Sequence, residues 1–248
     1  MTRAAIAFQD VTLGYERHPA VHHLDGFVAP GSLLAIVGPN GGGKSTLLKG
    51  IAGAIRPMDG RIDIAGARRH DIAYLPQQAE IDRSFPLCVF EMVAMGLWRR
   101  IGAFFTARGE DRERVKKAIA AVGLEGLEKR YVGTLSGGQL QRVLFARLLV
   151  QDASIILLDE PFAAVDARTC GDLMNLIKGW RAEGRTVLSV MHDFPMVRAN
   201  FPETLLLARE KIAWGDTAQV LTDANLARAQ TMSEAWIDHA DLCRRDVA

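Results

Sequence analysis

Short apolar runs alternate with amphipathic stretches along most of the chain. Ser32–Val37 and Ser154–Leu158 are apolar at consecutive positions, which is typical of strands buried on both faces of a parallel sheet. Alternating or short apolar runs predict further strands at Ala4–Val11, Val21–Val28, Gly60–Ala65, Asp71–Leu75, Thr186–Val190, Thr204–Ala208 and Lys211–Trp214.

Helical periodicity fills the intervals between these strands. Lys44–Ile55 follows the first buried run, and Ala167–Arg181 lies between two later strands, as a right-handed crossover requires. Between them the strand pattern stops, and three helices are predicted at Val89–Trp98, Arg108–Val122 and Gly138–Val150. We therefore expect an α/β protein with a helical insertion, and a C-terminal helical part that begins at Ala218–Leu221.

The composition is that of an ordinary globular protein, with 49% hydrophobic and 24% charged residues among 248. A net charge of +1 gives no overall field that attracts nucleic acid, so no nucleic-acid partner is expected. The three cysteines are widely spaced, which favours neither a disulfide framework nor a zinc cage. The sequence has neither an apolar run of about 18 residues nor a signal peptide's apolar stretch. We expect a soluble protein, so another chain must supply any membrane part.

A glycine-rich segment separates the first buried run from the helix after it. It reads Gly38-Pro39-Asn40-Gly41-Gly42-Gly43-Lys44-Ser45-Thr46 and matches the phosphate-loop pattern GxxxxGK[ST]. Glycines can turn their backbone N–H groups inward around a phosphate, and the start of the next helix favours the same anion. Lys44 is expected to reach the β- and γ-phosphates of ATP, and Ser45 to offer its hydroxyl to Mg²⁺. All nine residues are therefore predicted to bind the nucleotide.

Two acidic residues follow the second buried run. Asp159 and Glu160 come directly after Ile155-Ile156-Leu157-Leu158, at the end of the strand where open α/β sheets bind ligands. Asp159 is expected to hold Mg²⁺, and Glu160 to orient and deprotonate the attacking water. Alone, this pattern also fits a strand that ends in a solvated acidic turn. The phosphate loop in the same chain favours ATP hydrolysis.

A third motif, Leu135-Ser136-Gly137-Gly138-Gln139, precedes a predicted helix. Ser136 can cap the first turn of that helix, and the two glycines let the backbone approach an anion closely. On physical grounds alone, a second phosphate-facing helix start and a plain capped turn both fit this motif.

With this motif between the phosphate loop and the acidic pair, residues 4–222 resemble the nucleotide-binding subunit of an ATP-binding-cassette (ABC) transporter. The resemblance implies an α/β phosphate-loop NTPase (RecA-like) core with an antiparallel β subdomain and a helical insertion subdomain. It implies a single domain over 1–248. Residues 1–84 and 151–222 would form the core and β subdomain, 85–150 the helical signature subdomain and 223–248 a C-terminal tail.

The resemblance also implies roles for residues outside these motifs. Tyr15 resembles the aromatic residue that stacks on adenine, and Gln77, in Tyr-Leu-Pro-Gln, resembles the glutamine that contacts Mg²⁺ and the attacking water. Asp166 resembles a residue at the dimer contact, and His192 the switch histidine on the γ-phosphate. The implied catalytic residues are Glu160, His192, Gln77 and Lys44. The implied metal ligands are Ser45, Gln77 and Asp159.

The same resemblance implies several partners. In the family, Ser136 and Gly138 of one subunit contact the γ-phosphate held by the loop of the other, with Gly137 and Gln139 in the same segment. We therefore expect a homodimer that closes around two ATP molecules. An integral-membrane permease and a periplasmic substrate-binding protein would complete the system. The chain would lie on the cytoplasmic face of the inner membrane.

The cargo is suggested by the segment Gln77–Val89, which resembles the zinc and manganese importers. In that group a polar stretch leads to Phe-Pro-x-x-Val and then to a helix that ends in Met-Gly, here Met95-Gly96. The chain departs from the group's usual pattern at Cys88, Met191 and Phe194-Pro195. The apolar segment Phe85–Phe105 is expected to receive a helix of the permease, although Met92, Met95 and Trp98 also fit a plain core pattern.

Other interpretations remain open from the sequence. A subunit for another cargo, such as an iron chelate, is the main alternative, and a soluble ABC ATPase outside transport is a weaker one. Near the C-terminus, His239 and Cys243 would share a helix face, with Asp238 close by. A regulatory zinc site there is weaker than the interpretation as a solvated tail.

Overall fold

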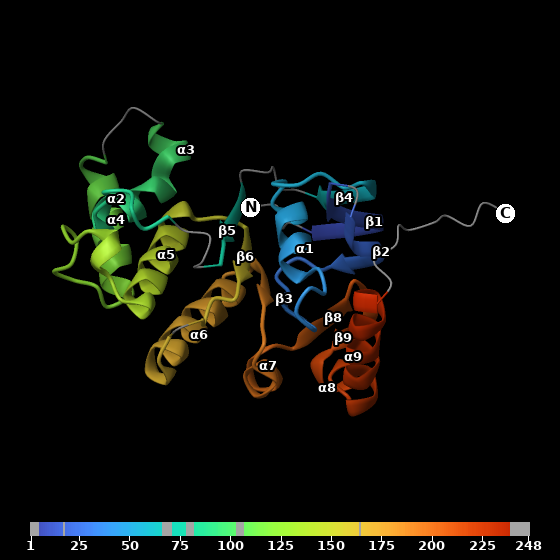
Figure 1. The fold of residues 1–248 in the computed structure, drawn as a ribbon. Helices are drawn as coiled ribbons and strands as arrows, with labels where there is room; N and C mark the ends of the chain where they lie inside the picture. The colour runs from blue at the N-terminus through green and yellow to red at the C-terminus, as the bar shows by residue number, and fades with distance from the viewer. Residues whose placement is uncertain are drawn as a thin grey trace.

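A computed structural model describes residues 5–16, 18–65, 71–77, 82–102, 107–163 and 165–238. Within these residues the strands form two sheets (Figure 1). A three-stranded antiparallel sheet has the order β2-β1-β4, with β2 at His18–Val28, β1 at Ala5–Tyr15 and β4 at Asp59–Ala65. A six-stranded sheet has the order β5-β6-β7-β3-β8-β9, with bounds Ile72–Leu75, Ile155–Asp159, Thr186–Val190, Leu33–Val37, Glu203–Ala208 and Glu210–Asp216.

The central strands of the six-stranded sheet are parallel and buried on both faces. Along β3, Leu34 and Ile36 belong to one apolar cluster, whereas Leu33, Ala35 and Val37 belong to the other. The consecutive apolar residues of the sequence therefore arise because the two faces of this strand pack into two different apolar clusters. The predicted α/β phosphate-loop fold with an antiparallel β subdomain and a helical insertion is confirmed.

Helix α1 (Lys44–Ile51) lies between the two sheets, where its apolar side chains join the core with β1 (Figure 1). A Cβ at Gly50 would come within 2.6 Å of Leu13, so the helix packs closely on this strand. The prediction of a helix as far as Ile55 is wrong. Gly53 adopts a left-handed conformation with φ 74° and ends the helix early.

The helical lobe comprises α2 (Val89–Ala94), η3 (Met95–Leu97), α3 (Trp98–Ile101), α4 (Glu110–Ala121), η4 (Val132–Thr134) and α5 (Gly137–Gln151). It projects from the sheet on the side of β5 and β6 (Figure 1). The single helix predicted at Val89–Trp98 is interrupted by η3, where Gly96 packs against α5. A Cβ there would lie 2.5 Å from the carbonyl oxygen of Arg147. The division into a core and a helical subdomain at residues 85–150 stays a prediction.

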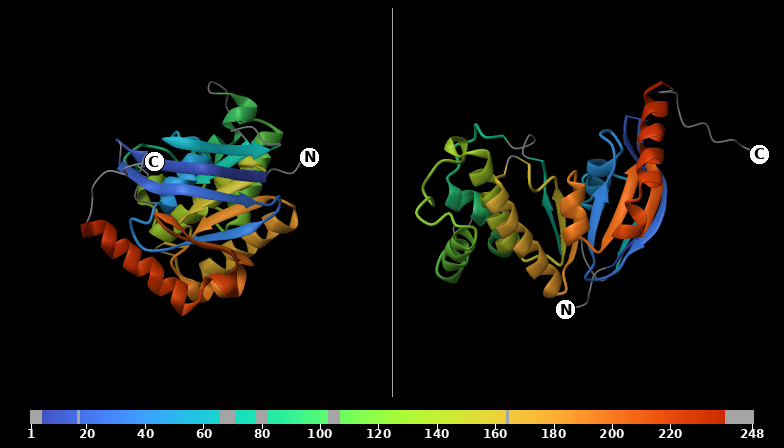
Figure 2. Two further views of the ribbon diagram at one scale, coloured as in Figure 1. Left: turned by 90° about the vertical axis from the view of Figure 1, so that its right-hand side faces the viewer. Right: turned by 90° about the horizontal axis from the view of Figure 1, so that it is seen from below.

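Helices α6 (Ala167–Ala182), α7 (Phe194–Asn200), α8 (Thr217–Val220) and α9 (Asp223–Asp238) follow the later strands. Helix α9 lies along the outer side of β8 and β9 (Figure 2), and Ala229 on it is buried. The segment 223–248, predicted as a tail, thus begins as a packed helix. His239 and Cys243 lie outside the described residues, and the side chain of Asp238 is not described either.

Two absences hold for the part of the chain that the structure describes. None of its helices has the length and apolar character needed to cross a membrane. Its His, Cys, Asp and Glu side chains form no group suited to hold a metal ion on their own.

Candidate active site

The phosphate loop (Gly38–Thr46) connects β3 to α1 and lies directly against neighbouring backbone. Gly38 has φ 146°, and a Cβ on it would come within 1.9 Å of the carbonyl oxygen of Leu207 in β8. Gly43 precedes α1 with φ 87°, and its Cβ would lie 2.2 Å from the carbonyl oxygen of Ala20. Both positions require glycine for conformation and for space. The loop is therefore fixed between β8 and β2.

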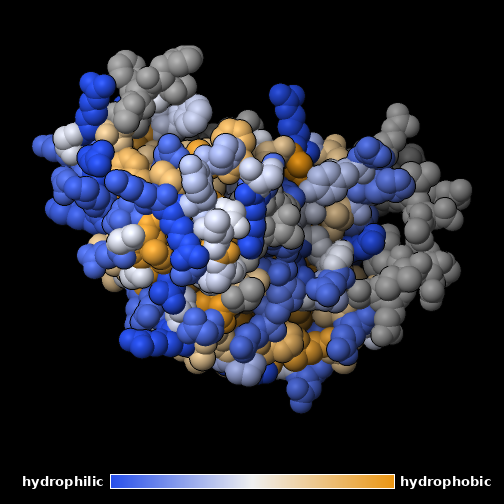
Figure 3. Space-filling model, turned by 60° about the vertical axis from the view of Figure 1, so that its left-hand side comes forward, coloured by the Kyte–Doolittle hydropathy of each residue, from blue (hydrophilic) through white to orange (hydrophobic). Residues whose placement is uncertain are grey.

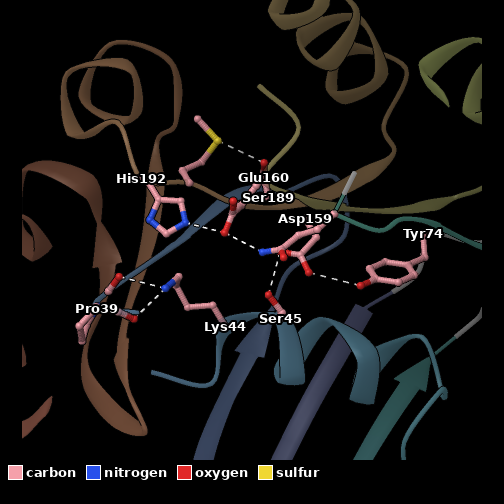
Figure 4. Close-up of polar contacts among 11 residues, drawn as sticks. Pro39, Lys44, Ser45, Tyr74, Asp159, Glu160, Ser189 and His192 are labelled. Carbon is pink, nitrogen blue, oxygen red and sulfur yellow. Dashed lines mark hydrogen bonds and ion pairs between the residues drawn. The ribbon is translucent and has the colours of Figure 1, made fainter. Parts of the chain in front are cut away.

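Lys44 is buried and folds back over this loop. Its Nζ donates to the carbonyl oxygens of Gly38 at 3.0 Å and Pro39 at 2.8 Å (Figure 4). Burial lowers the pKa of the Lys44 amino group, and the nearby carboxylates of Glu160 and Asp159 oppose that shift. The ammonium group thus closes one side of the loop, where an anion would gain both a charge and hydrogen-bond donors.

Asp159 ends β6 and brings its carboxylate next to the start of α1. The Ser45 hydroxyl donates a hydrogen bond to Oδ1 of Asp159 at 3.0 Å, and the phenol of Tyr74 on β5 donates one to Oδ2 at 3.3 Å (Figure 4). The aspartate is only 1% exposed. A hydroxyl and a carboxylate side by side are the hard oxygen ligands that Mg²⁺ prefers. These residues therefore fit a magnesium ion beside the phosphates.

Glu160 follows Asp159 and points its carboxylate between two neighbouring strand ends. Gln77, after β5, donates its Nε2 to Oε1 of Glu160 at 2.7 Å, and Nε2 of His192, after β7, lies 2.7 Å from the same oxygen (Figure 4). Glu160 has φ 51°, a left-handed conformation that costs a non-glycine residue about 1 kcal/mol or more. With this backbone conformation the carboxylate lies within hydrogen-bond distance of both Gln77 and His192.

Strand order explains why these groups meet. β5, β6 and β7 are parallel neighbours, so Gln77, Glu160 and His192 all follow the carboxyl ends of adjacent strands. The sheet thereby brings together six of the residues predicted from sequence, namely Lys44, Ser45, Gln77, Asp159, Glu160 and His192. A phosphate chain in the loop would lie against a metal site and a carboxylate base, which is the arrangement needed to hydrolyse a nucleoside triphosphate.

The signature segment (Leu135–Gln139) lies elsewhere, at the start of α5 in the helical lobe. Ser136 caps this helix: its Oγ accepts from the backbone N–H of Gln139 at 3.2 Å, and the Gln139 side chain accepts from the N–H of Ser136 at 3.1 Å. Gly137 and Gly138 form the first turn. The other end of α5 contacts β5 through Gln151. Because a helix rises about 1.5 Å per residue, the signature lies about 20 Å from that contact.

Two other predicted residues lie at the ends of secondary-structure elements, outside this group of six. Tyr15 ends β1 with its ring half exposed. Asp166 caps α6, and hydrogen bonds from the backbone and hydroxyl of Thr169 hold the pKa of its carboxyl below the usual range. Arg142 of α5 donates to the Thr169 hydroxyl at 2.5 Å, so the signature helix and the start of α6 are joined.

Sequence reasoning missed Tyr74 as a site residue, along with Arg142. Tyr74 falls within the apolar run Ile72–Leu75, which reads as core, and its partner Asp159 lies 85 positions away. A usable signal was present, since Tyr74 precedes Gln77 by three residues and so comes close to the same strand end. Arg142 carries no comparable signal, because no sequence motif links it to Thr169, which lies 27 positions away.

Comparisons with known proteins match these features. The ABC transporter family model matches residues 21–163. The manganese transport system ATP-binding protein MntB of Listeria monocytogenes is 40% identical over 88% of this chain and 92% of its own length. The zinc transport system ATP-binding protein TroB of Treponema pallidum is 38% identical over 92% and 87%. A dimeric post-hydrolysis structure of the ATP-binding cassette MJ0796 with ADP and Pi has a TM-score of 0.76, with 27% identity over 86% of this chain and 98% of that one.

Proposed function

Because this chain belongs to the ABC transporter family and is an ATPase, we propose that it drives the import of a divalent metal ion, manganese or zinc. The cargo is supported by one observation: relatives that match almost the whole chain are named as manganese or zinc transport subunits. The ATP site itself does not discriminate among cargoes, because the transported ion does not enter it. The cargo therefore has to be tested by uptake.

In the proposed mechanism, the phosphate loop and Lys44 bind the triphosphate of ATP, and Tyr15 stacks on adenine. The ammonium group of Lys44 exchanges its bonds to Gly38 and Pro39 for phosphate oxygens, which provide stronger charge-assisted bonds. Ser45 and Asp159 would hold Mg²⁺, with the amide oxygen of Gln77 as a further ligand. A bound ion would supply positive charge that offsets the negative charge of the phosphates.

Glu160 is the proposed base of the reaction. Its carboxylate accepts the proton of the water that attacks the γ-phosphate. The Gln77 amide and the His192 ring contact the same carboxylate oxygen, so they orient Glu160 toward the water. The other carboxylate oxygen is left to take the proton. In the same proposal His192 also contacts the γ-phosphate, which would make it sensitive to whether ATP or ADP is bound.

Two copies of the chain complete the site in this proposal. The signature segment of each copy contributes Ser136, Gly137, Gly138 and Gln139 to the ATP held by the other copy, and Asp166 lies at the contact between them. The position of the signature, far along α5 from β5, supports a contact with another chain. The start of α5 also carries the positive end of the helix dipole, which favours an anionic γ-phosphate. Hydrolysis would remove that bridge and loosen the dimer.

The proposed permease contact is an exposed apolar surface of the helical lobe, defined by Phe85, Met95 and Trp98. These side chains are 63%, 40% and 53% exposed, whereas Met92 on the same segment is buried in the core. Figure 3 shows apolar patches among hydrophilic residues on the face of the molecule that carries this lobe. A permease helix docked here would bury them and place the chain at the cytoplasmic face of the membrane.

Metal uptake by cells tests the proposed cargo and the contact together. A strain that lacks this chain is expected to accumulate less ⁵⁴Mn or ⁶⁵Zn, and the wild-type chain should restore uptake. With Trp98→Glu the restored uptake should be lower than with wild type by a factor of about ten or more, since a charge buried in an apolar contact costs several kcal/mol. The same variant should retain the ATPase rate of the purified wild-type protein, because the exposed Trp98 side chain is not part of the nucleotide site.

Lys117→Glu is the matched control, since Lys117 is exposed on α4 outside the proposed contact. It should restore uptake fully. Normal manganese and zinc uptake in the deletion strain, with loss of iron-chelate uptake instead, would contradict the proposed cargo. Full uptake with Trp98→Glu would contradict the proposed contact.

A further inference from the structure

Tyr74 contributes a second hydrogen bond to the carboxylate that is expected to hold the metal ion. We propose that Tyr74 is a positioning residue: its phenol fixes the orientation of Asp159, so that the aspartate meets Mg²⁺ with its carboxylate already aligned. This inference rests on the metal-binding role proposed for Asp159. It adds a residue that acts on the ion through Asp159 and touches neither the nucleotide nor the ion.

The two oxygens of Asp159 have different partners. Ser45 donates to Oδ1 and Tyr74 donates to Oδ2, so each carboxylate oxygen is held by a different residue (Figure 4). When Ser45 turns its hydroxyl toward a metal ion, its bond to Asp159 weakens. The Tyr74 phenol still donates to Oδ2 in that state and restrains rotation of the carboxylate. Outer contacts of this kind commonly tune metal affinity.

The length of the tyrosine side chain is what makes the contact possible. In the parallel register Tyr74 lies opposite Leu157, two positions before Asp159. At about 3.3 Å per residue, the phenol has to reach roughly 6.6 Å along the strand direction. A tyrosine spans this distance with a rigid ring and a polar tip. Phenylalanine would fill the same space without the hydroxyl, and it is therefore the informative substitution.

The backbone that carries Tyr74 is itself held by the helical lobe. β5 is the edge strand of its sheet, and two side chains of α5 donate to its carbonyls: Arg147 to Tyr74 at 3.3 Å and Gln151 to Ile72 at 3.2 Å. Arg147 and Gln151 are one helical turn apart and so share a face. The phenol is thus placed by two lobes of the molecule. A shift of α5 relative to the sheet would therefore displace the Tyr74 phenol from Asp159.

Metal binding, measured apart from hydrolysis, tests this inference. Mn²⁺ is titrated into the protein with the non-hydrolysable analogue AMP-PNP, and free Mn²⁺ is followed by its EPR signal. Tyr74→Phe should raise the apparent Kd for Mn²⁺ about tenfold. Its affinity for AMP-PNP in EDTA should equal that of wild type, because the phosphate loop is untouched. Tyr131→Phe, which removes a phenol on the exposed surface, should match wild type in both measurements.

The outcomes separate this inference from the proposed function. A Mn²⁺ titration of Tyr74→Phe that superimposes on wild type would overturn it. A parallel loss of AMP-PNP affinity in EDTA would also overturn it, because the tyrosine would then serve general packing. If wild type itself takes up no Mn²⁺ with the nucleotide, the proposed metal site is wrong as well.

Discussion

Glu160→Gln is expected to lower ATP hydrolysis at least about 100-fold while nucleotide binding stays intact. A glutamine keeps the size of the side chain and can still accept the hydrogen bond from Gln77, so the site should keep its shape. It cannot accept a proton from water, and a general base contributes about 100- to 10,000-fold to such a reaction. The left-handed backbone conformation at position 160 costs about the same free energy with glutamine as with glutamate.

Phosphate release and nucleotide binding, both measured on purified protein, check this expectation. Glu125→Gln is the control: Glu125 is exposed in the helical lobe, and its replacement should leave the rate unchanged. Hydrolysis by Glu160→Gln at more than a tenth of the wild-type rate would show that another group takes the proton. His192, which contacts the same carboxylate oxygen, would then be the first candidate.

Lys44→Ala is expected to weaken ATP binding at least about 30-fold. Truncation of a buried charged hydrogen-bond partner costs about 2 kcal/mol or more, which corresponds to that factor. The variant removes the ammonium group that bridges Gly38 and Pro39, so the phosphates lose a charge and the loop loses a support. Calorimetric titration with ATP measures the affinity, and hydrolysis should fall below detection at moderate ATP concentrations.

Lys117→Ala provides the comparison for this variant, since that lysine is exposed on α4. It should bind ATP as wild type does. ATP affinity of Lys44→Ala within threefold of wild type would mean that the backbone N–H groups of the loop hold the triphosphate without the lysine. Thermal unfolding of the ligand-free variant should remain cooperative, which ensures that the loss reflects the site and not the fold.

The buried strands could be predicted from the sequence because both of their faces pack in apolar clusters, so consecutive residues are apolar. Ser32–Val37 and Ser154–Leu158 are apolar at every inner position, and each leads into a motif with its own chemistry. The phosphate loop, the strand before it and the helix after it are thus all consistent with one fold. Asp159 and Glu160, at the end of the second buried strand, could therefore be assigned to the same site as the loop. The helix at Lys44 was placed correctly at its start, where the loop glycines define it.

The parts that sequence reasoning missed depend on contacts between distant segments. The early end of α1 comes from the left-handed Gly53, and the break at Gly96 comes from close packing on Arg147. The packing of α9 depends on its contacts with β8 and β9, which no local pattern reveals. Tyr74 likewise gains its place in the site only when β5 and β6 pair in register.

The central claim is that two copies of this chain share each ATP, and the mass of Glu160→Gln in solution tests it most directly. With saturating ATP and Mg²⁺, light scattering after size exclusion should give twice the mass of the single chain, and without nucleotide the mass of one chain. Adding Ser136→Arg should return the protein to a single chain that still binds ATP, since the arginine would occupy the space of the partner's phosphate. A monomer at saturating ATP, or a dimer indifferent to Ser136→Arg, would contradict the account.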